Sequence, residues 1–200
     1  TNNGGQYWVT QLSGVHHLES VFFTSVNIGT TVGSFGTILR TTDGGNNWIV
    51  QTSGTSNNLN NVFFINDDIG LSVGESGRIL KTTNGGNNWV NQSSGTTAIL
   101  EDVHFVDPNV GYVVGLGGTI LKTTNGGNNW ITLVSGTSNH LWGVCFINSS
   151  VGTVVGSPGK IMKTTNGGQN WITQTSPCTD LLKKVFFYDE NFGSIIADNE

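Results

Sequence analysis

The sequence is poor in charged residues and in long apolar runs, and each shortage excludes a class of protein. Lys and Arg number 8 and Asp and Glu 13 in 200 residues, which gives a formal net charge of −5. Such a chain offers no basic surface to a phosphate backbone, so we expect no nucleic acid partner. No apolar run approaches the roughly 20 residues that a membrane-spanning helix needs, so we expect no membrane span either.

Cysteine is scarce as well. Cys145 and Cys178 are too few for a disulfide framework. Cys145 lies in an apolar run, where a small buried side chain is expected, and Cys178 lies in a Ser-Pro-Cys-Thr loop. The sequence leaves a bridge between the two open. The chain also begins without Met and shows no signal peptide, which is typical of a mature product or of an excised piece.

What the sequence has in abundance is a repeated octamer. It reads Thr123-Thr124-Asn125-Gly126-Gly127-Asn128-Asn129-Trp130, and it recurs at 41–48, 82–89 and 164–171, with a weaker copy at 1–8. The tryptophans that end the octamers are Trp8, Trp48, Trp89, Trp130 and Trp171. Their spacing of 40 or 41 residues indicates a stacked or radial repeat architecture.

Each octamer predicts a turn between two strands. Asn-Gly and Asp-Gly favour such turns because the backbone there needs positive φ. The Asn or Asp side chain accepts hydrogen bonds from the turn backbone. The Trp then begins the outgoing strand, and burial of its ring contributes about 2–3 kcal/mol. We therefore assign a structural role to the five tryptophans and to Asn3, Asp43, Asn84, Asn125 and Asn166.

Each period predicts four short strands. The first carries L-x-x-V-x-[FH], at 18–24, 59–65, 100–106, 141–147 and 182–188, and its alternation indicates one buried face. A G-x-x-V-G run, a G-x-I-[LM]-[KR]-T-T run and a short run after the Trp supply the other three. No segment has helical periodicity. The predicted fold is an all-β propeller of four-stranded antiparallel blades, with the first strand of each blade lining a central channel.

We expect one domain, residues 1–200, which is either a propeller or a segment of a longer one. The repeats cover about 18–58, 59–99, 100–140 and 141–181, with partial repeats at 1–17 and 182–200. The first partial repeat would supply only an outer strand, and the last lacks its third strand. A permuted five-bladed ring with a defective last blade is the alternative. Unpaired strand edges at the ends would invite self-association.

The octamer and its surroundings also resemble a known family. T-x-[DN]-x-G-x-x-W is similar to the Asp-box, or bacterial neuraminidase repeat, at the turn between the third and fourth strands of propeller blades. G-x-I-L-K-T-T-N-G-G-N-N-W, followed by S-G-T and L-x-x-V-x-F, resembles the propellers of the photosystem II assembly-factor-like family. The resemblance implies a propeller over nearly the whole chain and a secreted protein, extracellular or on the cell surface. In these families the box is a structural element.

The sequence gives little support to catalysis. A sialidase, which the box brings to mind, needs three convergent arginines, and this chain has two, Arg40 and Arg78. Arg40 also shares its repeat position with Lys81, Lys122 and Lys163, which indicates a structural or solvated role. A glycoside hydrolase needs two carboxylates across a cleft, and Glu75 with Glu101 could supply them. We expect no catalytic residue, and a carbohydrate-active enzyme or a fragment of one is the alternative.

Metal and cofactor sites are not expected. His16, His17, His104 and His140 are scattered along the chain, and His104 stands where other repeats have Phe. Zinc at His16 and His17 would need further ligands from elsewhere. Only Asp43 among the boxes supplies a carboxylate, so a strong calcium site there is not expected either.

The repeats differ most at the entries to their first strands, which should lie on the face opposite the boxes. These positions read Glu19-Ser20, Asn60-Asn61, Glu101-Asp102, Trp142-Gly143 and Lys183-Lys184. Relaxed constraint on exposed loops would also produce such divergence. Trp142 is the one tryptophan outside the boxes, and as an exposed aromatic it would suit a glycan or a peptide. The predicted ligand site comprises Trp142, Glu101, Asp102, Asn60, Asn61, Glu19, Lys183 and Lys184, in a non-catalytic module that presents one variable face to a protein or glycan.

Overall fold

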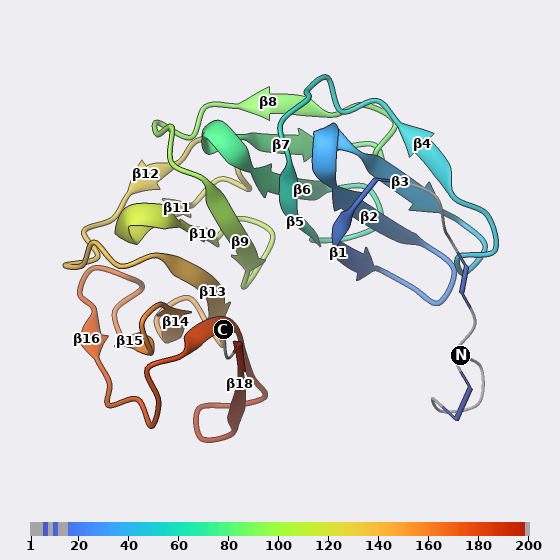
Figure 1. The fold of residues 1–200 in the computed structure, drawn as a ribbon. Helices are drawn as coiled ribbons and strands as arrows, with labels where there is room; N and C mark the ends of the chain where they lie inside the picture. The colour runs from blue at the N-terminus through green and yellow to red at the C-terminus, as the bar shows by residue number, and fades with distance from the viewer. Residues whose placement is uncertain (1–5, 8–9, 12–15, 199–200) are drawn as a thin grey trace.

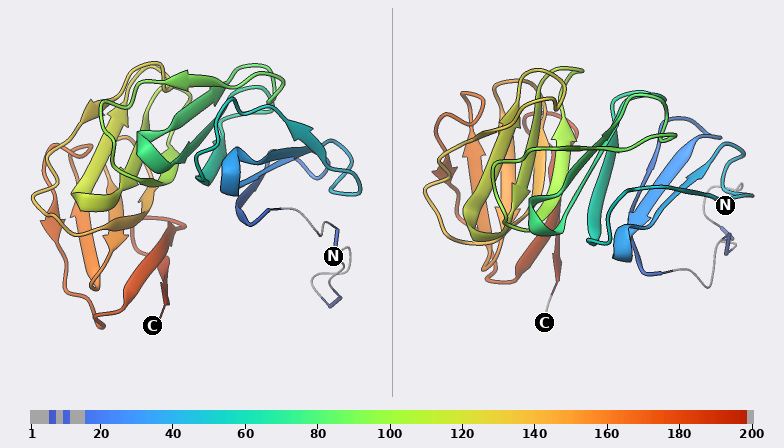
Figure 2. Two further views of the ribbon diagram at one scale, coloured as in Figure 1. Left: turned by 45° about the horizontal axis from the view of Figure 1, so that its top comes forward. Right: turned by 90° about the horizontal axis from the view of Figure 1, so that it is seen from above.

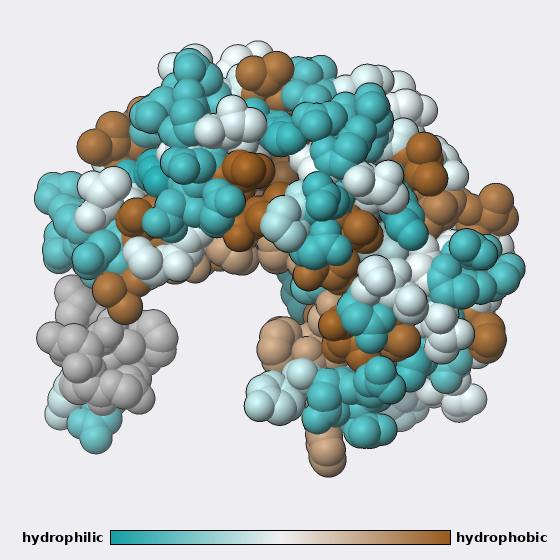
Figure 3. Space-filling view, turned by 180° about the vertical axis from the view of Figure 1, so that it is seen from behind, coloured by the Kyte–Doolittle hydropathy of each residue, from teal (hydrophilic) through white to brown (hydrophobic). Residues whose placement is uncertain are grey.

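The computed structural model describes residues 6–7, 10–11 and 16–198. Its strands form small antiparallel sheets that lie side by side along an arc, with the first strand of a sheet on the inner side and the fourth on the outer side (Figures 1 and 2). The space-filling view shows a crescent with an open concave side (Figure 3). This arrangement confirms the predicted β-propeller of four-stranded blades.

Each sheet is a meander, in which consecutive strands are neighbours. The first blade contains β1 (Leu18–Phe23), β2 (Gly29–Gly33), β3 (Ile38–Thr41) and β4 (Ile49–Gln51). The second contains β5 (Leu59–Phe64), β6 (Gly70–Gly74), β7 (Ile79–Thr82) and β8 (Val90–Gln92). The third contains β9 (Leu100–Phe105), β10 (Gly111–Gly115), β11 (Thr119–Thr123) and β12 (Ile131–Thr132).

The fourth blade contains β13 (Leu141–Phe146), β14 (Gly152–Gly156), β15 (Lys160–Thr164) and β16 (Ile172–Thr173). The last sheet pairs β17 (Leu181–Phe187) with β18 (Gly193–Asp198). Among the described residues, helical structure is limited to three 3-10 turns, η1 (Ser34–Gly36), η2 (Glu75–Gly77) and η3 (Leu116–Gly118), each between the second and third strands of its blade. No helix in this part of the chain is long and apolar enough to cross a membrane.

The hydrophobic core lies between neighbouring blades rather than inside a single one. Val73 and Ile79 of the second blade pack in one cluster with Val103 and Phe105 of the third. A cluster of the same kind joins each of the other neighbouring pairs. The alternating L-x-x-V-x-F strand explains this, because side chains two apart along a strand point toward the same neighbouring blade. Each blade is therefore stabilised mainly by the blades beside it.

The boxes hold the turns between third and fourth strands with the same contacts in each described copy. In the second blade the Thr82 hydroxyl accepts a hydrogen bond from the Gly86 N–H at 2.8 Å. The Asn84 side-chain oxygen accepts one from the Asn88 N–H at 3.0 Å. Asp43, Asn125 and Asn166 accept equivalent bonds in the other blades. Both glycines of each of the four described boxes have positive φ, which explains why glycine recurs there.

The box tryptophans that are described occupy equivalent positions. Trp89 packs edge-on against Phe64 of its inner strand, with ring centroids 6.0 Å apart. Trp48, Trp130 and Trp171 make the same contact with Phe23, Phe105 and Phe146. The outgoing strand begins one residue after each Trp, so the prediction that the Trp itself begins it is wrong by one position. Asn3 and Trp8 lie outside the described residues, as does most of the outer strand expected before Gly14.

Candidate functional site

A β-bulge lies at the same position in every inner strand. The strand pairing skips one residue there, between Leu18 and Ser20 in the first blade and between Leu59 and Asn61 in the second. Bulges disrupt the ladder locally and re-aim the extra side chain. The bulged residues of the five inner strands are Glu19, Asn60, Glu101, Trp142 and Lys183. The predicted variable positions are thus the irregular points of the sheets.

All five bulges border one hollow of about 360 Å³, which we call the inner-strand pocket. Every inner strand contributes to it, and η2 adds a further side chain, so the pocket lies along the inner strands, whose arrangement Figure 1 shows. Its lining residues are Glu19, Asn60, Glu75, Ile99, Glu101, Trp142, Lys183 and Lys184.

Six of the eight residues of the predicted ligand site line this pocket, and two do not. Asp102 is 7% exposed, and its carboxylate accepts a hydrogen bond from the Val144 N–H of the next blade at 2.9 Å. Asn61 is 8% exposed. Both side chains follow a bulge and are buried, so neither lines the pocket with the other six. In the second and third blades the inner strand therefore offers its bulged residue to the pocket and buries the side chain of the next one.

Trp142 is partly buried rather than exposed. Its indole N–H is fully buried and has no hydrogen-bond partner. The expectation of an exposed aromatic was therefore wrong. What Trp142 offers to the pocket is part of its ring surface.

Ion pairs fix the lysine side of the pocket. The Lys184 ammonium of the last sheet lies 2.7 Å from Oδ1 of Asp102 in the third blade. Lys183 forms a salt bridge with Asp198 of the neighbouring strand. Because Asp102 is buried and would be costly to leave unpaired, the first of these pairs locks β17 against the third blade.

The carboxylate side of the pocket is less well compensated. Glu101 accepts a hydrogen bond from Nδ2 of Asn60 at 3.2 Å, and the structure gives it no salt bridge among the described residues. Burial raises the pKa of the Glu101 carboxyl to about 7. Lys184 and the bond from Asn60 oppose that shift, and the charges of Asp102 and Glu19 add to it. Glu101 therefore titrates much closer to neutral pH than an ordinary glutamate.

Two pocket residues escaped the sequence-based ligand set. Glu75 enters from η2 and accepts hydrogen bonds from the backbone N–H and side chain of Asn58. Ile99 precedes β9. The sequence offers Glu75 as a carboxylate for hydrolysis and, with Phe35, Leu116 and Pro158, as one of the variable positions at the turns between second and third strands, but these turn positions were not included in the ligand set.

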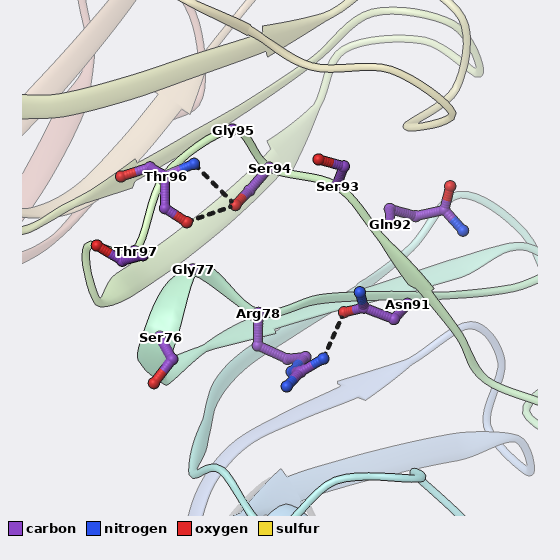
Figure 4. A pocket seen from close by; sticks show the side chains of 10 residues that line it. All are labelled: Ser76, Gly77, Arg78, Asn91, Gln92, Ser93, Ser94, Gly95, Thr96 and Thr97. Atoms are coloured by element: carbon purple, nitrogen blue, oxygen red, sulfur yellow. Dashed lines mark hydrogen bonds between the residues drawn. The ribbon is translucent and has the colours of Figure 1, made fainter.

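A second hollow, about 660 Å³, lies on the outer side of the second blade. Figure 4 shows its lining residues coming from η2, from Arg78 just before β7, from β8 and from the segment 93–97. They largely bond to one another: Arg78 donates to Asn91 at 2.8 Å, and the Ser94 hydroxyl donates to the Thr96 carbonyl at 3.1 Å. Only the Nε of Arg78 is left buried without a partner. Sequence analysis missed this groove, which comes from the S-G-T segments after the outer strands.

Several charged and histidine side chains outside the two hollows make structural contacts. Arg40 donates to the Asp67 carbonyl at 3.3 Å, and Lys81 and Lys122 reach the boxes of the following blades. His104 bonds the Phe146 carbonyl at 2.9 Å. No group of three or more His, Cys, Asp or Glu in the described residues could hold a metal ion. Cys145 and Cys178 are free thiols, so the bridge that the sequence left open is not formed.

Comparisons with solved structures agree with this fold. A structure of YCF48 bound to a D1 peptide superimposes with a TM-score of 0.74 at 21% identity, over 94% of this chain and 62% of that one. YCF48 from Cyanidioschyzon merolae gives 0.68 at 23% identity, over 85% and 60%. An ancestral GH74 enzyme gives 0.67 at 20% identity, over 81% of this chain and 24% of that one. The chain thus spans about three fifths of the two YCF48 structures.

The sequence comparison assigns the family. No curated protein matches the chain significantly. The family described as photosynthesis system II assembly factor YCF48 matches residues 3–94 and again residues 87–177, which together cover most of the chain. With the boxes and the propeller in place, the chain belongs to the YCF48 family of photosynthesis system II assembly factor propellers.

Proposed function

We propose that the chain is a non-catalytic scaffold that binds a segment of a partner protein in the inner-strand pocket. The observation that carries the proposal is the contrast between the boxes and the bulges. The boxes keep the same contacts from blade to blade, whereas the five bulged residues vary, with Glu in two blades and Asn, Trp and Lys in the others, and they meet in one pocket. Rigid blades that aim different side chains at one point suit recognition of an irregular ligand.

A peptide ligand is favoured over a glycan, which is the other ligand class expected from the sequence. The structure of YCF48 bound to a D1 peptide belongs to a protein of this family and fold. Trp142 is partly buried, which reduces the flat aromatic surface that a sugar ring would stack on. The pocket instead combines charged groups with a limited apolar wall, as in sites for polar side chains.

A glycoside hydrolase is the second candidate, because one observation favours it. Glu75 and Glu101 line the same pocket, and the raised pKa of Glu101 suits a general acid. GH74 enzymes share the fold at 20% identity or less. An assay of wild type against Glu101→Gln on a panel of β-glucans and xyloglucans separates the candidates. We expect no turnover above that of the variant.

The binding proposal is tested by selection of random phage-displayed peptides on the wild-type protein. We expect enriched peptides whose affinity falls at least tenfold in Glu101→Gln and in Trp142→Phe, which alter the pocket with little change in shape. The box variant Asn47→Ala is the matched control on the opposite face and should bind normally. Recovery of no peptide, or loss of binding in Asn47→Ala alone, would reject the pocket as the site.

A secreted or cell-surface location and self-association through strand edges are further parts of this proposal. The first rests on the family resemblance and is tested by fractionation of cells that produce the protein. The second rests on apolar side chains at the end of the array, such as Phe186 and Ile196, which are 66% and 63% exposed. Sedimentation at increasing concentration measures it.

A further inference from the structure

We propose that the inner-strand pocket takes a basic side chain, an arginine or a lysine of the partner segment. Its charge would lie among Glu19, Glu75 and Glu101, and its alkyl stem would lie against Trp142. This inference rests on the proposed function, since it specifies the chemistry of the segment that the pocket binds.

The charge left over in the pocket is the first argument. Both lysines of the lining are paired within the protein, Lys184 with Asp102 and Lys183 with Asp198. Once these pairs are counted as neutral, three carboxylates remain, contributed by β1, η2 and β9. The net charge of −5 of the whole chain acts in the same direction on an approaching cation.

The partners of these carboxylates are weak, which leaves room for an external cation. Glu19 lies 3.2 Å from Nδ1 of His17, an imidazole whose side chain is 84% exposed. Among the described residues, Glu75 and Glu101 accept hydrogen bonds only from neutral amide groups, those of Asn58 and Asn60. A guanidinium or ammonium could add charge-assisted bonds that these neutral donors do not provide.

The shape of the site is the second argument. A hollow of about 360 Å³ is at the lower end of the range of small-ligand pockets, roughly 300–1,000 Å³, and suits a side chain better than a folded surface. Arginine and lysine bury their methylene stems along apolar surface while the charged head stays among polar groups. Trp142 and Ile99 supply such a surface, and the indole face also attracts a cation.

Binding of a cation should be coupled to ionisation of Glu101, whose pKa of about 7 belongs to the empty pocket. The charged groups acting on it are Lys184, Asp102 and Glu19, and Glu75 and Lys183 line the same pocket. A bound cation favours the ionised carboxylate and lowers that pKa, so a proton is released on binding. Affinity for a basic segment should therefore rise between pH 6 and pH 8.

The test uses two blocked pentapeptides that differ only in a central arginine or its neutral isostere citrulline, titrated into the wild-type protein by calorimetry. At pH 8 we expect the arginine peptide to bind at least about tenfold more tightly than the citrulline peptide, which is the effect of one charge-assisted hydrogen bond. The preference should shrink at pH 6. In Glu101→Gln it should be small at both pH values, while Glu190→Gln, an exposed carboxylate at the turn between β17 and β18, should behave as wild type.

The outcomes separate this inference from the proposed function. Equal binding of the two peptides, both weakened by Trp142→Phe, would overturn the basic preference and keep the pocket as a peptide site. If neither peptide binds, and the phage selection recovers peptides of acidic or neutral sequence, the basic preference is likewise overturned and the pocket is kept as a peptide site. A preference for arginine that persists in Glu101→Gln and in Glu75→Gln would place the cation outside the pocket and overturn the inference.

Discussion

The same sheet face appears twice in this molecule, once between blades and once at the end of the array. In the second blade Val62 and Phe64 of β5 are 2% and 3% exposed. Their counterparts in the first blade, Val21 and Phe23 of β1, are 57% and 43% exposed. The residue types and the strand register are the same, so the difference lies in the neighbour. The strand pattern sets where a side chain points, and the adjoining blade decides whether it is buried.

The opposite end of the array shows the same dependence of burial on a neighbouring blade. Val73 of β6 is fully buried, whereas Ile196, at the same position in β18, is 63% exposed. Burial of an aliphatic or aromatic side chain contributes about 1.5–3 kcal/mol, so a blade with one neighbour lacks a large share of its stabilisation. The inner blades should accordingly be the last to unfold and the terminal sheets the first.

The largest effect is expected from truncation of the buried aromatic. Phe64→Ala removes a ring that packs among Leu59, Leu80 and Trp89, and it should lower the free energy of unfolding by about 3–5 kcal/mol. Phe23→Ala removes a half-exposed ring and should cost about 1 kcal/mol or less. Urea unfolding of the two variants measures the difference. Equal losses would mean that the end face is covered in solution.

A smaller effect of the same kind is expected at the glycines under these rings. A Cβ at Gly70 would lie 2.6 Å from the ring of Phe64, which is packed on all sides, so Gly70→Ala should cost about 1–3 kcal/mol. A Cβ at Gly29 would lie as close to Phe23, but that ring borders solvent and can move away. Thermal melts should show the larger drop for Gly70→Ala. A matching drop for Gly29→Ala would indicate a rigid first blade.

The third comparison concerns two bulged glutamates. Burial raises the pKa of the Glu101 carboxyl to about 7, so ionisation of this carboxyl opposes folding. Its contribution to the free energy of unfolding is fully present below the pKa that the group has in the unfolded chain, and it is lost as pH rises through 7. After allowance for partial exposure, Glu101→Gln should stabilise the protein at pH 8 by about 1–2 kcal/mol. Glu19→Gln, at the exposed end blade, should change stability less. Unfolding curves at pH 5 and pH 8 measure both, and a flat pH response of the wild type would contradict the assignment.

Most of the fold could be predicted because the same turn and strand patterns recur in each repeat of the sequence. The boxes fix the turns through short-range contacts, such as the bond from the Gly86 N–H to Thr82, which depend only on local sequence. The inner strands could be located because their valines and phenylalanines alternate. The start of the outer strands was missed by one residue, since the bond from the Asn88 N–H to Asn84 extends the turn beyond the glycines.

The site was predicted less well because bulges leave no clear mark in a single sequence. Regular alternation places Glu101 and Asp102 on opposite faces of the strand, but it does not predict the skipped pairing beside Leu100, where Glu101 lines the pocket and Asp102 is buried. The Lys184–Asp102 pair joins residues 82 positions apart, which no local pattern reveals. Convergence of the inner strands, which buries part of Trp142, is likewise a property of the whole array.

The smallest effect is expected from exchange of the third residue of the box, which is Asp43 in the first blade and Asn84 in the second. The two boxes are otherwise identical. Asp43 accepts the same bonds as Asn84, from the threonine hydroxyl and from the backbone N–H four residues on. The backbone and side-chain bonds from Asn47 and the bond from Thr41 lower the pKa of Asp43. Its contribution is therefore present above about pH 4 and is lost as pH falls through the lowered pKa. Asp43→Asn should preserve the turn and leave stability at neutral pH nearly unchanged, while it removes this part of the acid sensitivity. Chemical unfolding at pH 7 and pH 3 tests both statements. A large loss at pH 7 would show that the first box depends on its charge, unlike the boxes of the inner blades.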